Sequence, residues 1–397
     1  MPATPNPSPL NGKYLAANPL LRGALYAADA YVSIRFPRRA ATNIPTPKRL
    51  LLANSAHLGD VLIMTGLFTS LKAYNPDMEI GCVVGSWAAH IVKANPLVSF
   101  VHIIDHWKQN RAKMSLFEKY RRYQSTARAA LAEMRAIGYD VAIDVYPFFP
   151  NVALWLHQAR IPVRIGYTSG GFGNLYTHPM DWAMRDAHVL EYHFQLLKCL
   201  PNFTAEHFEK RQVILHGESP PRDRATEHCI VLHIGAGHHK KNWLLDSWKQ
   251  LAARLIGDGY TVVFTGSGSA DEKKIQSVTK DLPGSVNLCN QLSWREFIGV
   301  IEHAELLIGV DSVSTHIADA VGTPSVTLYT GIQNPHWWKP MHGNGVALTH
   351  PVWCAPCYRT NGCKTMECIN GVSVEQVYAQ AKLLLSLQQR SLNPQKA

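Results

Sequence analysis

The sequence lacks the features that would place this chain across a membrane or on a secretory route. No apolar run approaches the roughly 20 residues that a membrane-spanning helix needs. Residues 1–10 are rich in proline and hold no basic segment followed by a hydrophobic core, so we expect no signal peptide. The expected location is therefore the cytoplasm.

Signatures of several nucleotide and nucleic-acid binders are missing too. No arginine-rich helix or nucleic-acid motif stands out, so we expect no nucleic-acid partner. The glycine-containing segment 235–243 lacks the Lys-Ser/Thr ending of a P-loop. After Gly266-Ser267-Gly268, Asp271 holds the place of the third glycine of a dinucleotide fingerprint, which argues against a nicotinamide dehydrogenase.

The composition is that of an ordinary soluble globular protein with an excess of positive charge. The chain has 397 residues, of which 46% are hydrophobic and 17% charged, and two domains of common size fit this length. A net charge of +10 favours anionic partners, which include nucleotide phosphates, an acidic substrate or a membrane surface.

The segment 13–49 holds seven basic residues against a single acid, Asp29. An apolar stripe at helical spacing runs beside them. Two interpretations stay open: a basic amphipathic helix in peripheral contact with an anionic inner membrane, or a helix packed on the N-terminal domain with a solvated basic face. The stripe consists of Leu20, Leu21, Ala24, Leu25, Ala28, Tyr31 and Val32.

Apolar runs and amphipathic segments alternate along the chain, which predicts an α/β fold with parallel sheets. The polar stretch 201–227 interrupts the alternation, and we interpret it as an interdomain connection with one further strand at 212–215. The predicted organisation is a basic N-terminal extension over 1–48, an N-terminal domain over 49–205, a C-terminal domain over 206–372 with a Cys-rich loop at 354–368, and a final helix and tail over 373–397. The predicted strands cover 49–54, 79–84, 101–104, 139–145, 162–166, 229–234, 261–265, 286–288, 306–308 and 325–329.

Both halves place an acid where a predicted strand becomes a helix. Gly309-Val310-Asp311-Ser312 has this position in the C-terminal half, and Leu58-Gly59-Asp60 has it in the N-terminal half. Ligands bind there in open α/β sheets, because helix N-terminal amides point out of the carboxyl edge. His316, one turn into the second helix, is either a structural residue or a donor to a phosphate or sugar. The two junctions predict a two-lobed enzyme with its site in the cleft.

Two segments that follow predicted strands, the one with Asp60 and the one with Gly235 and Gly237, each have a structural interpretation beside the functional one. Asp60 is either a plain helix cap, favoured by the helix dipole, or a general base. Gly235 and Gly237 let backbone amides approach an anion, to which Lys240 or Lys241 adds a cation. The alternative for this second segment is a solvent-exposed loop.

Together these motifs resemble glycosyltransferase family 9, the ADP-heptose:lipopolysaccharide heptosyltransferase group. The matching segments run in the family's order and cover about residues 49–380. They are the Gly59-Asp60 turn with Asn75-Pro76, the segment Arg164-Ile165-Gly166-Tyr167, residues 233–237 with Lys241 and Trp243, and residues 309–312 with His316 and Gly322-Thr323-Pro324.

The resemblance implies a GT-B architecture, in which two Rossmann-like domains with parallel sheets face each other across a cleft. It also implies an inverting transfer that requires no metal or other cofactor for catalysis. Asp60 matches the family's general base toward the acceptor, and Lys241 matches the lysine that stabilises the diphosphate leaving group. The implied donor-binding residues are Gly235, Gly237, Glu272, Asp311, Ser312, Val313 and His316, and the implied acceptor side holds His57 and Gly59.

The implied donor is a nucleotide-sugar, ADP-heptose, and the implied acceptor is a phosphorylated lipid or glycan of the lipopolysaccharide core. Two departures bear on these partners: Val313 replaces a frequent glycine beside the donor, and His57 stands where an arginine or another polar residue is frequent. One alternative keeps the fold and glycosylates a protein or another glycan. The other is a non-catalytic nucleotide-sugar-binding protein, against which Asp60 and Lys241 argue.

Four cysteines fall within 15 residues in the spacing C-x2-C-x5-C-x4-C. Clustered thiols in a cytoplasmic chain predict a structural zinc site, or an iron site. The alternative is a loop of reduced cysteines without metal, since the spacing is not that of a standard zinc finger. The candidate ligands are Cys354, Cys357, Cys363 and Cys368.

Overall fold

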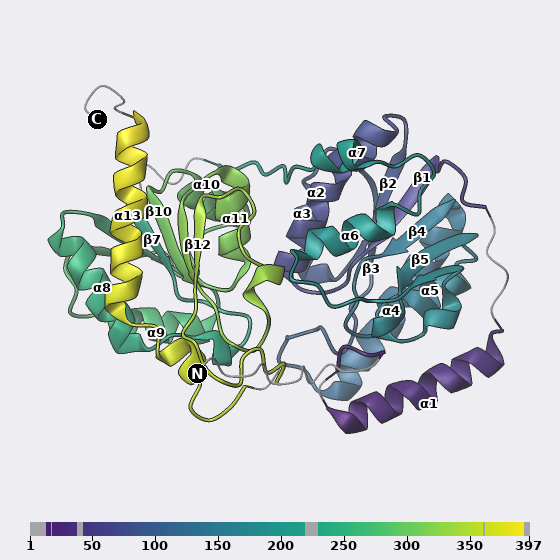
Figure 1. Cartoon of the computed structure of the whole chain (residues 1–397), viewed down its shortest axis with the longest axis horizontal. Helices are drawn as coiled ribbons and strands as arrows, with labels where there is room; N and C mark the ends of the chain where they lie inside the picture. The colour runs from purple at the N-terminus through teal and green to yellow at the C-terminus, as the bar shows by residue number, and fades with distance from the viewer. Residues whose placement is uncertain (1–12, 17, 38–42, 219–228, 360–361, 393–397) are drawn as a thin grey trace. The chain divides into compact units, whose positions relative to one another are not determined.

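The computed structural model describes residues 13–16, 18–37, 43–218, 229–359 and 362–392 (Figure 1). The described residues divide into two compact units, one within 13–214 and the other within 215–392, which we call the N-terminal and the C-terminal unit. In the described part of the chain, no helix has the length and apolar character needed to cross a membrane.

The N-terminal unit is built on a six-stranded sheet with the strand order β3-β2-β1-β4-β5-β6, and all neighbouring strands are parallel. The first strand is the apolar run Arg49–Ala53, in which the last four side chains are buried, as expected for a strand covered on both faces. The strands are β1 (Arg49–Ala53), β2 (Glu79–Val84), β3 (Val98–Ile103), β4 (Val141–Asp144), β5 (Val163–Tyr167) and β6 (His178–Met180).

The helices of this unit begin and end at recognisable signals. Helix α4, for example, starts with a capping box between Ser115 and Glu118 and stops at Gly138, whose φ is 70°. The predicted strand at Gln212–Leu215 is wrong, because the Gln212 amide bonds to Gly66 and Thr69 of α2 and the segment joins no sheet. The helices are α1 (Pro19–Arg35), α2 (Leu58–Tyr74), α3 (Ala89–Lys93), α4 (Leu116–Ile137), α5 (Ala153–Gln158), α6 (Val189–Leu197) and α7 (Ala205–Glu209).

The C-terminal unit repeats this plan with the strand order β12-β11-β10-β7-β8-β9, again with parallel neighbours. Its strands are β7 (Cys229–His233), β8 (Thr261–Thr265), β9 (Ser285–Asn287), β10 (Leu306–Val310), β11 (Ser325–Leu328) and β12 (Gly345–Leu348). Its helices are α8 (Leu245–Gly257), α9 (Ser269–Thr279), α10 (Trp294–Glu302), α11 (Val313–Val321), α12 (Glu367–Asn370) and α13 (Val374–Leu392). The predicted α/β fold with parallel sheets is thus confirmed.

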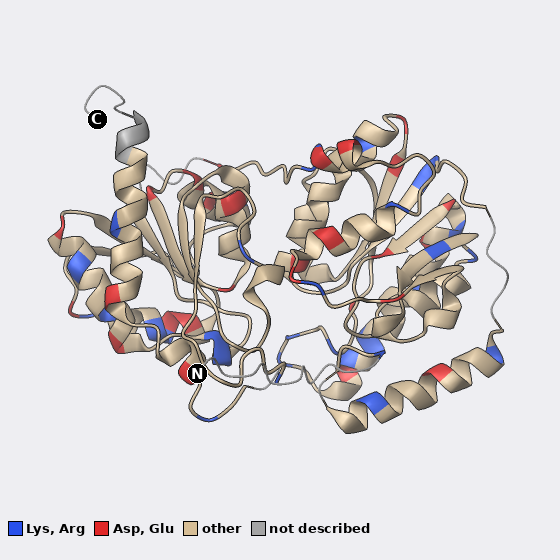
Figure 2. Cartoon of the chain, in the orientation of Figure 1, with Lys and Arg blue, Asp and Glu red and all other residues tan. Residues whose placement is uncertain are grey.

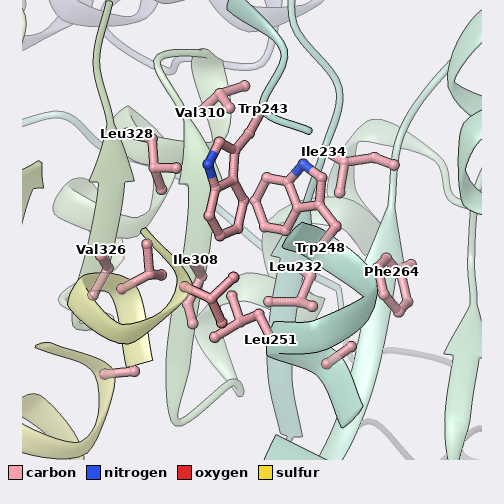
Figure 3. Packing of buried hydrophobic residues seen from close by; sticks show 14 of the residues in the cluster. Leu232, Ile234, Trp243, Trp248, Leu251, Phe264, Ile308, Val310, Val326 and Leu328 are labelled. Carbon is pink, nitrogen blue, oxygen red and sulfur yellow. The ribbon is translucent and has the colours of Figure 1, made fainter. Parts of the chain in front are cut away.

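Two tryptophans organise the core of the C-terminal unit. The rings of Trp243 and Trp248 meet edge to face with centroids 5.1 Å apart, and apolar side chains of the sheet surround them (Figure 3). The Trp243 Nε1 group donates to the Val372 carbonyl at 2.9 Å, which fixes the chain just before α13. Helix α13 then packs against α8, β10 and β11.

In each sheet, the strands that come next in the sequence lie on one side of the first strand, and the later strands lie on its other side. β1 lies between β2 and β4, and β7 lies between β8 and β10. The loops that follow β1 and β4, and those that follow β7 and β10, therefore leave the sheet in diverging directions. Such switch points are the ligand-binding positions of open α/β sheets.

Candidate active site

The switch point of the C-terminal unit holds a lysine and an aspartate in contact. Lys241 ends the short 3-10 turn η4 (His239–Lys241) after β7, and Asp311 directly follows β10. The Lys241 Nζ lies 2.5 Å from Asp311 Oδ2, and both side chains are mostly buried. The two strands thus place one cation and one acid at the predicted ligand edge.

The neighbouring lysine has a different partner, which resolves the sequence ambiguity between the two. Lys240 Nζ donates to the Cys363 carbonyl at 3.0 Å and packs against Gly362. Lys240 therefore serves the Cys-rich loop, whereas Lys241 serves the switch point.

Helix α11 starts beside this ion pair. Ser312 is its N-cap residue, but the Ser312 hydroxyl pairs with the Ser314 hydroxyl at 2.8 Å instead of capping an amide. Val313 is the first helical residue. Burial lowers the pKa of His316, so its imidazole is neutral at neutral pH and can donate a hydrogen bond without adding charge.

Gly235 lies in the loop after β7, and a packing reason favours glycine at this position. A Cβ atom there would come within 2.5 Å of Asp271 Oδ2 and 3.2 Å of His233 Nε2, so a side chain would require Asp271 to move. His233 is buried, which lowers its pKa to about 4, and it pairs with the Thr265 hydroxyl at 2.9 Å. Gly237 is exposed two residues further on.

Glu272 belongs to another cluster. It lies in the first turn of α9, where its Oε2 accepts from Asn290 Nδ2 at 3.4 Å. Asn290 in turn accepts from the Gly268 amide at 2.6 Å. The structure therefore brings Lys241 and Asp311 together, and no contact described here joins Glu272 to them.

The switch point of the N-terminal unit holds Asp60. This residue lies in the first turn of α2, and its Oδ2 accepts from the His57 amide at 3.1 Å, so it does cap the helix. Gly59 lies beside it in the same turn. The carboxylate is also within electrostatic range of Arg111 and of Tyr146, which follows β4.

Arg111 and Tyr146 were not among the predicted site residues. The Tyr146 hydroxyl accepts from Gln109 Nε2 at 2.7 Å, and burial together with the nearby Asp60 charge raises the Tyr146 pKa. Their signal in the sequence is weak, because Tyr146 is a single aromatic after the predicted strand 139–145 and Arg111 lies in a loop that has no motif.

The four clustered cysteines are free thiols. Within the residues that the structure describes, no group of three or more His, Cys, Asp or Glu side chains is arranged to hold a metal ion. Cys363 Sγ instead accepts from the Met366 amide at 3.4 Å, and Cys368 is part of the hydrophobic core. Burial, and then the nearby thiols of the cluster, raise the pKa of Cys368. The predicted zinc or iron site therefore has no assembled ligand set here, although the thiols are close enough to interact.

A family model described as glycosyltransferase family 9 (heptosyltransferase) matches residues 128–367. The chain is also 24% identical over 304 residues to lipopolysaccharide heptosyltransferase 3 of Escherichia coli, across 72% of this chain and 84% of that relative. The match to the family model includes the segments that carry Lys241 and Asp311.

Two solved structures share the fold. The glycosyl transferase family 9 protein from Veillonella parvula has a TM-score of 0.68 and 20% identity, over 87% of this chain and 99% of that one. The E. coli heptosyltransferase WaaC with ADP has a TM-score of 0.65 and 16% identity, over 85% and 99%. The two units are thus the two Rossmann-like domains of a GT-B fold. Since the family model spans more than half of its length, this chain belongs to glycosyltransferase family 9 and is a glycosyltransferase of the heptosyltransferase family.

Proposed function

We propose that the protein transfers heptose from ADP-heptose to a lipopolysaccharide core acceptor, with inversion at the anomeric carbon and without a catalytic metal. The reaction would take place in the cytoplasm, in peripheral contact with the inner membrane. The observation that carries the proposal is the contact of Lys241 with Asp311 at a switch point, beside the first turn of α11.

The proposed roles of the donor-binding residues follow from the negative charge that develops on the leaving diphosphate. As the glycosidic bond breaks, the diphosphate gains negative charge, and a cation with helix amides beside it stabilises the transition state more than the ground state. Lys241 supplies the cation and α11 supplies the amides. Asp311 holds the lysine and accepts from a ligand hydroxyl, while Ser312 and neutral His316 donate to phosphate or sugar.

The remaining predicted donor residues have smaller proposed roles. Gly237 is exposed and leaves the backbone after β7 accessible to the nucleotide. Gly235 lets this backbone pass close to Asp271 on its way to the donor, and Val313 shapes the pocket at the start of α11. Glu272 is proposed to bind the nucleoside end of the donor, because it lies in the first turn of the helix after β8 and contacts Asn290, which follows β9.

The acceptor half rests on Asp60. In the proposed single displacement, the acceptor hydroxyl oxygen bonds to the anomeric carbon while the bond from that carbon to the diphosphate breaks. The hydroxyl proton moves to the Asp60 carboxylate, and ADP leaves with the bonding electrons. His57 and Gly59, in the same turn, would contact the acceptor.

No metal takes part in this mechanism. If zinc or iron is present, the proposed ligands are the four thiols of the Cys-rich loop, and the role would be structural. EDTA should leave initial transfer rates unchanged. Metal analysis of the purified protein, with less than one zinc or iron per chain, would reject the structural site.

A thermal-shift screen tests the donor and separates the alternatives. ADP-heptose should raise the melting temperature, whereas UDP- and GDP-sugars should not. Transfer of labelled heptose is then measured with lipopolysaccharide core, with protein and with other glycans as acceptors. Stabilisation by ADP-heptose without transfer to any acceptor would favour a non-catalytic binding protein, and stabilisation by another nucleotide-sugar alone would reject the proposed donor.

A further inference from the structure

Helix α1 is anchored to the N-terminal unit by one face. The buried Asp29 carboxylate accepts from the Tyr14 hydroxyl at 2.6 Å and pairs with Lys13 at 2.5 Å. Leu25 and Val32, on the same face, are buried in two apolar clusters of this unit. The helix is therefore part of the folded unit, held by a polar anchor between apolar contacts.

The opposite face of α1 is apolar and exposed. Leu20 and Ile34 are each 85% exposed, and Tyr31 is 67% exposed. Together with Ala24 and Ala27 they follow the spacing of one helix face. The α1 sequence holds one acid, the buried anchor Asp29, so no acid lies on this face. Figure 2 shows the helix mostly in the tan of uncharged residues.

A second apolar surface lies on the first turns of α4. Leu116 is 72% exposed and Phe117 is 70% exposed, with exposed Lys113 and Arg121 beside them. Phe149 lies between α1 and the loop before α4, since it packs on the cluster of Tyr14 and Leu25 and also lies under the ammonium of Lys108, 3.7 Å from its ring centroid.

The positive charge of the protein lies in these same two regions. Residues 1–48 and 106–128 contain 13 of the 39 basic residues and 2 of the 29 acidic ones, so the rest of the chain has 26 basic against 27 acidic residues. Both acids are engaged locally, Asp29 as the α1 anchor and Glu118 in the capping box of α4. The excess charge is thus concentrated in these two segments of the sequence, which include α1 and the first turns of α4.

We infer that the outer face of α1 and the first turns of α4 bind an anionic lipid bilayer. We call this surface, defined by Leu20, Tyr31, Ile34, Leu116 and Phe117, the bilayer face. Exposed apolar and aromatic side chains flanked by basic residues are the features of helices that lie in a membrane interface. A second copy of the chain is the poorer occupant, because two such basic surfaces would repel each other.

The inference rests on the proposed function only for the reason why this protein would bind a membrane. A lipid-linked acceptor is presented at a membrane surface, and Arg111 of the 106–128 segment lies within electrostatic range of Asp60. The bilayer face would therefore hold the N-terminal unit where its proposed base can meet acceptor headgroups.

Vesicle co-sedimentation of the full chain tests the inference without a donor. Wild type should bind vesicles of phosphatidylcholine mixed with phosphatidylglycerol, and high salt should weaken this binding. Leu20→Glu/Ile34→Glu and Phe117→Glu should each lower the partition coefficient by at least about tenfold, because burial of one such side chain contributes about one tenfold step or more.

The matched control is Leu383→Glu/Leu387→Glu on α13, whose leucines are 50% and 52% exposed in the C-terminal unit. This variant should bind vesicles like wild type, and circular dichroism should show that all variants are folded. Equal binding to pure phosphatidylcholine, unchanged binding of the bilayer-face variants, or loss of a dimer in those variants by sedimentation would overturn the inference. Transfer to a deacylated, water-soluble acceptor is measured in parallel, because its failure would reject the proposed function while vesicle binding persists.

Discussion

Replacement of Lys241 by methionine separates its chemical role from its structural one. Methionine has a similar length and no charge, so Lys241→Met removes the cation that lies 2.5 Å from Asp311 Oδ2 and leaves most of the packing. We expect a large loss of turnover and a small loss of stability.

The two magnitudes come from different sources. Removal of one preorganised group that stabilises a developing charge costs about 10²- to 10³-fold in kcat, or about 2.7 to 4 kcal/mol. The ion pair is accessible to solvent at its edge, with side-chain exposures of 31% and 15%, so its removal should lower the free energy of unfolding by about 1 kcal/mol. The loss of transition-state stabilisation should therefore exceed the loss of unfolding free energy by at least about 1.4 kcal/mol, which corresponds to about tenfold in rate.

The assay is initial-rate transfer of labelled heptose at saturating donor, combined with urea denaturation. Lys240→Met is the matched control, because this neighbouring lysine donates to the Cys363 carbonyl instead. It should keep a kcat close to that of wild type.

Three results would refute the assignment. One is a kcat of Lys241→Met within about threefold of wild type, since a leaving-group cation cannot be so dispensable. Another is an equal loss in Lys240→Met. The third is recovery of turnover in the double variant Lys241→Met/Asp311→Asn, which would mean that the lysine serves only to neutralise Asp311.

Three further predictions concern both units. Asp60→Asn keeps an oxygen that can cap α2 but cannot take up the acceptor proton, so kcat should fall by about 10²- to 10⁴-fold while the urea midpoint stays near that of wild type; retained turnover would exclude Asp60 as the base. Burial raises the pKa of Asp144 to about 7, so the folded state holds a proton that the unfolded chain loses at lower pH. Relative to Asp144→Asn, wild type should then lose about 2 to 3 kcal/mol of unfolding free energy between about pH 5 and pH 8, and parallel pH profiles in urea titrations would contradict this. Trp243→Phe leaves the buried Val372 carbonyl without its donor, which should lower the unfolding free energy by about 1 to 3 kcal/mol, and an unchanged urea midpoint would show that the bond contributes little.

The central strands could be predicted from the sequence because they are buried on both faces. The run 49–54 corresponds to β1, Arg49–Ala53, and the run 229–234 corresponds to β7, Cys229–His233. The edge strands β3 and β9 were predicted, but the other two edge strands, β6 and β12, escaped prediction. Each has one neighbour in its sheet and only half-buried side chains, so neither requires the continuous apolar run that marks a central strand.

The candidate site was predictable in its positions but not in its contacts. The strand-to-helix junctions identified Asp60 and Asp311 because topology alone brings such junctions to the carboxyl edge. The choice between Lys240 and Lys241 was open because successive residues of a 3-10 turn point about 120° apart. Only the path of η4 decides which lysine meets an aspartate 70 positions away in the sequence.

Helix α1 shows how an apolar stripe can mislead. The sequence pattern groups Leu20, Leu25, Tyr31 and Val32 into one stripe, yet Leu25 and Val32 are buried while Leu20 and Tyr31 are exposed. The single-stripe prediction is therefore wrong, because the anchor Asp29 lies between the two buried residues and turns their face toward the unit. In the sequence, a single acid in a basic segment gives no sign of its importance. In the structure, a carboxylate with buried partners determines which side of a helix faces the protein. What remains outside is an exposed apolar face that includes Leu20, Tyr31 and Ile34. The packing of the helix on the N-terminal unit is therefore confirmed, and its contact with an anionic membrane stays a prediction.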